Sequence, residues 1–194
     1  MIPQSKATSQ PVIVADSKEV QRVLWRLSRE LQERHPQGDG VTLCGIVTRG
    51  VHIAERLQEL LEEHGDASWQ SASLDVGPYR DDLPRKAFAT LRQMTLPAAT
   101  RQQVEDRTLV LVDDVLYHGR TARAALVALA DLGRPRSVEL LVLVDRGHRE
   151  LPLRATYVGK NLPTSKDQVV RVRLRACDGE DSILVENQGG FPGK

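Results

Sequence analysis

The chain carries the stretch Thr108-Leu109-Val110-Leu111-Val112-Asp113-Asp114-Val115-Leu116-Tyr117-His118-Gly119-Arg120-Thr121, which decides the fold. It opens with a β-branched and aliphatic run, which is typical of a strand buried on both faces. Beyond Gly119, apolar residues recur at helical spacing from Ala124 to Leu132, and Gly133 ends the predicted helix. A buried strand that turns through a glycine into a helix is the unit from which parallel α/β sheets are built.

The same pattern recurs on both sides of this stretch. Residues 41–47 predict a buried strand that ends at Thr48-Arg49-Gly50, and a helix follows until Gly65. A first helix begins at Asp16 with a capping-box-like start and stops at residues 35–38, while residues 137–144 predict another strand. This alternation predicts an α/β fold with a parallel central sheet, flanked by helices and joined by right-handed crossovers.

The remaining segments predict a smaller cap and a terminal hairpin. Residues 74–79 are compatible with a strand, whereas residues 78–105 mix prolines and charges and predict a long mobile loop or hairpin. Residues 169–175 alternate strictly, Asp178-Gly179 is a turn and residues 182–186 return, which is a hairpin pattern. We therefore expect a flexible arm over residues 1–11, one domain over residues 12–187, and a flexible tail over residues 188–194.

Composition limits the class of protein. The 194 residues include 27 Lys and Arg against 26 Asp and Glu, so the formal charge is +1. That balance argues against a protein built to coat polyanions, although it allows a local basic patch. No apolar run approaches a membrane span, and the start of the chain has no signal-like segment. Cys44 and Cys177 lie far apart, which fits a reducing compartment, so we expect a cytoplasmic protein.

The quoted stretch also predicts chemistry. A glycine turn that opens a helix presents unpaired backbone N–H groups, which form an anion site suited to a phosphate. The adjacent carboxylates of Asp113 and Asp114 are suited to accept hydrogen bonds from paired hydroxyls. Phosphate at the turn and a diol at the acidic pair together describe a ribose 5-phosphate. The alternative is ordinary loop chemistry, because an acidic pair before a glycine turn is common.

Several segments carry a resemblance to a known family. Residues 109–121 resemble the 5-phosphoribosyl diphosphate motif of type I phosphoribosyltransferases, which identifies only the superfamily. More specifically, residues 45–50, 79–83, 144–152 and 157–165 are similar to bifunctional pyrimidine operon regulators with uracil phosphoribosyltransferase activity. These segments follow the family's order from about Val12 to Glu186, and the run Asp145-Arg146-Gly147-His148-Arg149-Glu150-Leu151-Pro152 is the most specific.

The resemblance implies a type I phosphoribosyltransferase fold with a small hood, and the conversion of uracil and 5-phosphoribosyl diphosphate into UMP and diphosphate. It implies that Gly119, Arg120 and Thr121 hold the 5-phosphate and that Asp113 and Asp114 hold the ribose hydroxyls. Diphosphate would bind at Thr48-Arg49-Gly50, with Arg80 or another basic residue of the loop closing over it. Mg²⁺ would bridge substrate oxygens, with Asp113 and Asp114 as the nearest protein groups and no dedicated metal cage. The catalytic candidates are Asp113, Asp114, Arg49 and Arg80.

The base site is implied by the resemblance as well. Uracil would lie under the hood, with the backbone around Val158 and Lys160 reading its edge and Tyr117 or Leu116 near its face. Arg146 would be a substrate-site residue, and the alternative is a surface ion pair with Asp145 or Glu150. The complete set of candidate substrate-binding residues is Thr48, Arg49, Gly50, Asp113, Asp114, Val115, Leu116, Tyr117, His118, Gly119, Arg120, Thr121, Arg146, Val158 and Lys160.

The chain departs from the family pattern at His118, where the family commonly has threonine. A histidine ring is bulkier than a hydroxyl and changes charge near neutral pH. Since backbone amides would still hold the phosphate, we expect weakened or pH-dependent substrate binding rather than its loss. Residues 84–100 also match the family poorly, which leaves the contacts of the loop open.

A basic helix face provides a candidate RNA contact. On the first helix Lys18, Arg22, Arg26 and Arg29 follow at spacings of four, four and three residues, with Trp25 beside them. They lie within an arc of roughly 100° opposite the apolar stripe, which offers phosphate contacts and a stacking plane. Arg171, Arg173 and Arg175 add a second basic face. The alternative is an ordinary solvated face, with Trp25 at a subunit interface.

Three functional hypotheses remain open from the sequence. The first is a homodimeric or larger uracil phosphoribosyltransferase that also binds leader mRNA when a uridine nucleotide occupies its site. The second keeps the transferase without RNA regulation. The third keeps RNA binding and makes the site a nucleotide sensor whose catalysis is weakened by His118. Reversal of Arg22 and Arg26 to glutamate is expected to weaken RNA binding without affecting uracil turnover.

Overall fold

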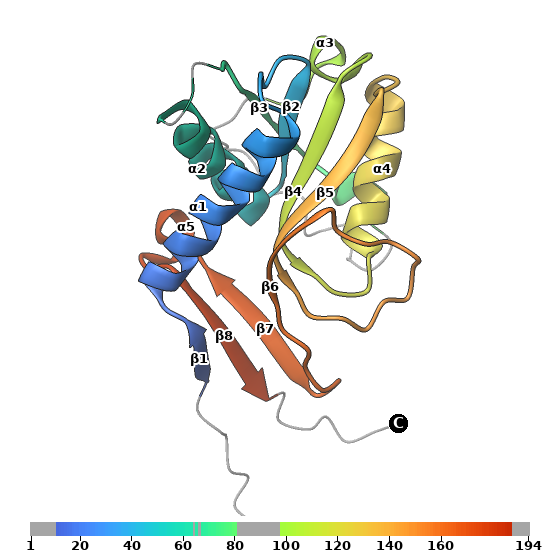
Figure 1. The fold of residues 1–194 in the computed structure, drawn as a ribbon. Coiled ribbons are helices and arrows are strands. Elements are labelled where there is room, and N and C mark those ends of the chain that lie inside the picture. The colour runs from blue at the N-terminus through green and yellow to red at the C-terminus, as the bar shows by residue number, and fades with distance from the viewer. Residues whose placement is uncertain (1–10, 64, 66, 81–97, 188–194) are drawn as a thin grey trace, which may run out of the picture.

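A computed structural model describes residues 11–63, 65, 67–80 and 98–187. Its centre is a five-stranded parallel sheet in the order β3-β2-β4-β5-β6 (Figure 1). The strands are β2 (Val41–Ile46), β3 (Gln70–Leu74), β4 (Thr108–Leu116), β5 (Ser137–Asp145) and β6 (Tyr157–Asn161). The predicted parallel α/β sheet is therefore confirmed.

Helices cover both faces of this sheet. The longest are α1 (Ser17–Arg34), α2 (Arg49–Glu63) and α4 (Arg120–Leu132). Alternate residues of β4 serve the two layers: Val110 packs with α1 and α2, whereas Leu109 and Leu111 pack with α4. Figure 1 shows α4 on the opposite side of the sheet from α1 and α2. This division explains why the apolar run at the start of β4 lacks a polar face.

A smaller antiparallel sheet lies beyond the carboxyl ends of the parallel strands (Figure 1). Its order is β1-β8-β7, from β1 (Val12–Ala15), β7 (Gln168–Arg173) and β8 (Ser182–Asn187), and the short helix α5 (Arg175–Asp178) joins β7 to β8. We call this sheet and α5 the hood. The terminal hairpin is confirmed, whereas no local pattern predicts the pairing of β1 with β8.

Two sequence expectations differ from the structure. The strand expected at residues 74–79 is wrong: β3 ends at Leu74, and Gly77–Tyr79 form the 3₁₀ helix η1, in which Pro78 supplies a fixed φ. In the expected loop over residues 78–105, Arg101–Val104 form the short helix α3, started by a capping box between Thr100 and Gln103. The rest of that prediction falls largely on residues 81–97, outside the described residues, as do most of the terminal arm and the tail.

The described residues contain no helix that is long and apolar enough to span a membrane.

Four polar side chains fasten the end of α1 to the sheet. Glu139 of β5 accepts hydrogen bonds from Arg34 Nε at 2.8 Å and from the Tyr157 hydroxyl at 2.6 Å, and it lies 3.0 Å from His35 Nε2. Burial alone would raise the pKa of Glu139, but hydrogen bonds from Tyr157 and His35 lower it below its usual value. The ionised carboxylate therefore contributes stability that is present above its unfolded pKa and lost as the pH falls through the lower folded pKa.

Glu139→Gln is expected to reduce the free energy of unfolding at neutral pH by about 2 kcal/mol, because charge-assisted bonds are lost within a half-buried cluster. The difference from the unmodified protein should shrink when denaturation is repeated at acidic pH, below the lowered pKa of the folded Glu139 carboxyl, where the native carboxylate itself is protonated. Glu33→Gln is the matched control, since Glu33 lies exposed near the end of α1, outside the Glu139 cluster. A loss that is equal at both pH values would contradict an electrostatic origin.

Candidate functional site

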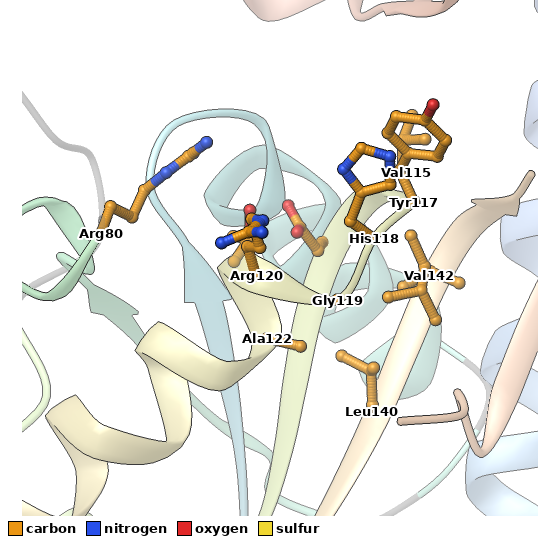
Figure 2. Close-up of a pocket in the computed structure, with 12 residues that line it drawn as sticks. Arg80, Val115, Tyr117, His118, Gly119, Arg120, Ala122, Leu140 and Val142 are labelled. Carbon is orange, nitrogen blue, oxygen red and sulfur yellow. The ribbon is translucent and has the colours of Figure 1, made fainter. Parts of the chain in front are cut away.

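Two cavities meet at the acidic pair, where β2, β4 and β5 end below the hood. The turn cavity, about 160 Å³, is lined by Arg80, Asp113, Val115, Leu116, Tyr117, His118, Gly119, Arg120, Thr121, Ala122, Leu140 and Val142 (Figure 2). The hood cavity, about 440 Å³, is lined by Arg49, Asp114, Val169, Val170, Arg171, Val172, Arg173, Asp178 and Glu186. The structure thus brings together the candidate residues from Asp113 to Thr121 with Arg49 and Arg80, and the two carboxylates face different cavities.

Asp113 and Asp114 lie on β4 itself, because the strand continues to Leu116. Asp113 Oδ1 accepts the Asp114 N–H at 3.0 Å, and Asp114 Oδ1 accepts the Val115 N–H at 2.9 Å. Burial and the neighbouring Asp114 charge raise the pKa of Asp113 well above its usual value. Burial also raises the pKa of Asp114, against the opposing effects of the Val115 N–H and the Arg49 charge. The pair is poised to receive hydroxyl donors or a cation.

The glycine turn places a helix N-terminus beside the first carboxylate. Gly119 is the N-cap of α4 with φ of 90°, a conformation that favours glycine. Its carbonyl accepts the Arg123 N–H at 2.9 Å, so the helix starts immediately after the turn. The first N–H groups of a helix lack partners within it and attract anions. The predicted phosphate cradle therefore opens into the cavity that also contains Asp113.

Two aromatic rings and a guanidinium group stack at one side of the turn cavity. The Tyr117 and His118 ring centroids lie 3.6 Å apart. The Arg146 guanidinium lies 3.7 Å from the centroid of the Tyr117 ring. Glu150 accepts from Arg120 Nη2 at 2.7 Å and lies 3.6 Å from His118 Nδ1. Figure 2 shows Arg80 on one side of the cavity and Tyr117 and His118 on the other. His118 thus lines the cavity, next to an acidic residue.

Arg146 is buried and holds the segment before β7 in place by hydrogen bonds. Its side chain donates from Nε to Thr164 Oγ1 at 3.1 Å and from Nη2 to the Gln168 carbonyl at 2.7 Å. The residue is 5% exposed. The alternative of an ion pair with Asp145 or Glu150 is wrong, because those carboxylates pair with Arg149 and Arg120 instead. Arg146 therefore fixes the segment that leads into β7 against the Tyr117 ring.

The segment Thr48-Arg49-Gly50 lies where β2 ends and α2 begins. A Cβ atom on Gly50 would lie 2.2 Å from the Val112 carbonyl oxygen, so only glycine allows α2 to approach β4 this closely. Arg49 extends into the hood cavity, where its Nη2 donates to both carboxylate oxygens of Asp178, at 2.9 and 3.2 Å. The Asp178-Gly179 pattern predicts only a turn, and no local signal pairs Asp178 with Arg49.

The two residues expected to contact the uracil edge lie away from both cavities. Val158 and Lys160 are on β6, and neither lines the turn cavity or the hood cavity. The Val158 carbonyl accepts from Arg26 Nη2 at 3.1 Å, and Lys160 Nζ lies 3.9 Å from the Glu19 carboxylate. Both positions therefore contact α1, because β6 is the edge strand beside that helix. Their assignment to the uracil edge gains no support from these contacts.

The basic face of α1 divides into two parts. Lys18, Gln21, Arg22 and Trp25 line an open groove of about 360 Å³, and Trp25 is 47% exposed. The Arg29 guanidinium lies 5.2 Å from the Trp25 ring centroid. Arg26, in contrast, binds Glu30 and the carbonyls of Val158 and Gly159, so it fastens α1 to β6.

The second expected basic face is also partly neutralised. Arg171 pairs with Glu186 on β8, and Arg173 Nη1 donates to Glu180 at 2.8 Å. Among the described residues there is no cluster of three or more histidine, cysteine or acidic side chains able to hold a metal ion. The half-buried acidic pair suits Mg²⁺ only as a partial ligand set, which fits an ion whose other ligands are substrate oxygens and water.

Comparison with protein families matches residues 14–176 to the phosphoribosyl transferase domain. Curated relatives named Bifunctional protein PyrR align over nearly the whole chain. The protein from Streptomyces coelicolor is 48% identical, covering 93% of this chain and 92% of the relative. The protein from Elusimicrobium minutum is 46% identical, covering 90% of this chain and 97% of the relative.

Solved structures with a similar fold include hypoxanthine phosphoribosyltransferases. The enzyme from Trypanosoma cruzi has a TM-score of 0.65 at 16% identity and covers 90% of this chain and 95% of its own. The enzyme from Staphylococcus aureus has a TM-score of 0.60 at 18% identity, covering 81% of both chains. At these identities the structures establish the fold, and the expected type I phosphoribosyltransferase architecture is confirmed.

Proposed function

The chain belongs to the phosphoribosyl transferase family, within its bifunctional PyrR proteins, and on this premise we propose that it makes UMP from uracil and regulates pyrimidine genes through leader mRNA. The transferase reaction joins uracil N1 to the ribose C1 of 5-phosphoribosyl diphosphate and releases diphosphate, with the N1 proton passing to the medium. The main observation that supports this proposal is that the acidic pair at the end of β4 lies beside the glycine turn that follows it, and that Asp113 lines the same cavity as this turn.

The chain's own residues divide the substrate between the two cavities. Backbone N–H groups at the start of α4 would hold the 5-phosphate, while Asp113 and Asp114 would accept from the ribose hydroxyls. The carboxylates also stabilise positive charge on the ribose as the diphosphate departs. Arg49 and Arg80, which approach from different sides, would bind the departing phosphates. Mg²⁺, when bound, would neutralise diphosphate charge beside the acidic pair.

Uracil turnover tests this assignment directly. Radiolabelled uracil, 5-phosphoribosyl diphosphate and Mg²⁺ should yield labelled UMP, and omission of 5-phosphoribosyl diphosphate should abolish the product. Binding of UMP without turnover would instead favour a nucleotide sensor whose catalysis is weakened at His118. Neither turnover nor UMP binding would contradict a phosphoribosyl site at Asp113–Thr121.

We assign the regulatory contact to the α1 groove. Lys18 and Arg22 would contact phosphates, and the exposed face of Trp25 offers a plane for a single-stranded base. Arg29 already lies over the Trp25 ring and would extend the stack. A homodimer or larger homo-oligomer in the cytoplasm would join such grooves into a wider surface. Occupation of the active site by a uridine nucleotide would favour the RNA-bound form.

Lys18→Glu with Arg22→Glu is expected to weaken leader-RNA affinity about 100-fold at low salt, because two phosphate contacts become repulsive. Uracil turnover should stay within twofold, since both residues lie outside the two cavities. Gel shifts with and without UMP measure the affinity. Lys18 is changed here in place of Arg26, because reversal of the Arg26 charge would also disturb the contact between α1 and β6.

Arg134→Glu is the matched control, because Arg134 lies exposed just after α4, on the other side of the sheet. It makes the same change of charge as each single replacement in the double variant, and so half of the total change, without altering the groove. Equal RNA affinity in the double variant and this control would remove the assignment to α1 and would favour the transferase without RNA regulation.

A further inference from the structure

Arg49 is already engaged by a carboxylate in the cavity where it would meet substrate. Both oxygens of Asp178 accept from the same Arg49 nitrogen, at 2.9 and 3.2 Å, and both side chains line the hood cavity. Asp114 lines the same cavity, and the Arg49 charge acts on it. The guanidinium therefore lies between an acidic residue of the reaction centre and an acidic residue of the hood.

Asp178 is held in place by its own helix. Its Oδ2 accepts the Leu174 N–H at 2.9 Å across the four-residue helix α5. Partial burial would raise the pKa of Asp178, but the Leu174 N–H and Arg49 lower it below the usual range. The side chain therefore remains a fixed anion in the hood cavity.

The Arg49 guanidinium also has an unused donor. Its Nε is buried and, among the described residues, has no hydrogen-bond acceptor. A buried N–H without a partner is unfavourable, and a ligand oxygen placed there would relieve that cost. Asp178 thus satisfies one edge of the guanidinium and leaves another donor for a ligand anion. The bidentate geometry that arginine forms with phosphate would need the nitrogen that Asp178 now occupies.

We propose that Asp178 competes with diphosphate for Arg49, and so limits the affinity for 5-phosphoribosyl diphosphate and speeds the release of diphosphate. This inference rests on the proposed function, which places diphosphate at Thr48-Arg49-Gly50. Diphosphate and the Asp178 carboxylate seek the same donor, and their charges repel across one small cavity. The Asp178 carboxylate of the hood therefore takes the place of the leaving group and balances the positive charge of Arg49 when no diphosphate is bound.

Removing only the charge of Asp178 separates competition from positioning. In Asp178→Asn an amide oxygen can still accept the Leu174 N–H and an Arg49 N–H, so α5 keeps its local bonds. Titration calorimetry with inorganic diphosphate and Mg²⁺ should show about tenfold tighter binding than in the unmodified protein, because charge-assisted competition and repulsion are lost. Under saturating substrates, diphosphate release should slow by a similar factor.

Two comparisons make the result specific. Glu180→Gln removes the same charge two residues away, where Glu180 pairs with Arg173 instead of Arg49, and should change diphosphate affinity less than twofold. In an Arg49→Ala background, Asp178→Asn should tighten binding much less than it does with Arg49 present, since the contested donor is gone and only the repulsion between the charges is relieved. Thermal melting verifies that each variant is folded before titration.

The outcomes also distinguish this inference from the proposed function. If the unmodified protein turns over uracil but Asp178→Asn binds diphosphate equally or more weakly, Asp178 is not a competitor and the inference is overturned. An equal gain in Glu180→Gln would overturn it too, because general electrostatics would then explain the change. If the unmodified protein neither binds diphosphate nor makes UMP, the proposed function itself fails.

Discussion

Replacement of Asp113 and Asp114 together by asparagine is expected to lower kcat/KM for uracil phosphoribosylation about 1,000-fold. Both carboxylates lie at the end of β4, each facing one of the two cavities. Asparagine preserves their shape but removes the negative charge that would stabilise the developing positive ribose. Losses of about 100-fold or more for one such electrostatic contact are typical, and paired groups are not additive. Steady-state kinetics with both substrates varied measures the effect.

The same double variant is expected to be at least as stable as the unmodified protein at neutral pH. Burial raises the pKa of both carboxyls above the unfolded value, so the native state disfavours their ionisation. Such groups oppose folding increasingly as the pH rises above the unfolded pKa, and neutral amides lack this penalty. Denaturation at pH 7 therefore serves as the control. Retained turnover would contradict the catalytic assignment, whereas lost turnover with lost stability would indicate unfolding.

Gly50→Ala is expected to reduce the free energy of unfolding by about 3 kcal/mol and to abolish most of the activity. The added Cβ would lie 2.2 Å from the Val112 carbonyl oxygen and would force α2 away from β4. For a domain of this size, that loss corresponds to a fall of about 6–12 °C in Tm. It would also displace Arg49, the preceding residue, from the hood cavity. Calorimetry and turnover measured on the same sample test both effects.

Gly147→Ala is the matched control for this clash. Gly147 has φ of 80°, but an added Cβ there would meet no atom within 4 Å. The variant should therefore cost only the backbone strain of about 1 kcal/mol. If Gly50→Ala were no more destabilising than Gly147→Ala, the close approach of α2 to β4 would not be the reason for glycine at position 50.

Local patterns were sufficient for most of the fold. The run at the start of β4, the Gly119 turn and the spacing in α4 each act over a few residues, and the structure confirms all three. The start of α1 is confirmed equally, because Asp16 accepts the Glu19 N–H at 2.9 Å. The acidic pair and the phosphate turn could also be predicted, since both belong to one contiguous stretch. The strand expected at residues 74–79 was wrong because Pro78 favoured a 3₁₀ turn.

Partners far apart in the chain were decided only by tertiary structure. Arg26 belongs to the predicted basic face by helical spacing, yet it reaches carbonyls on β6 that come from more than 130 residues later. Arg146 is buried against Tyr117 instead of pairing on the surface. Periodicity reports which face of an element a residue occupies, but not which element packs against that face.

The sequence by itself thus determined the parallel sheet, the acidic pair at the end of β4 and the glycine turn into α4, because each depends on neighbours within a few residues. The tertiary structure alone decided which charges meet. It placed Asp178 of the hood against Arg49 of the β2–α2 connection, and it separated Asp113 and Asp114 into different cavities. Such pairings depend on how two sheets and their helices pack, and no spacing along one element encodes that arrangement.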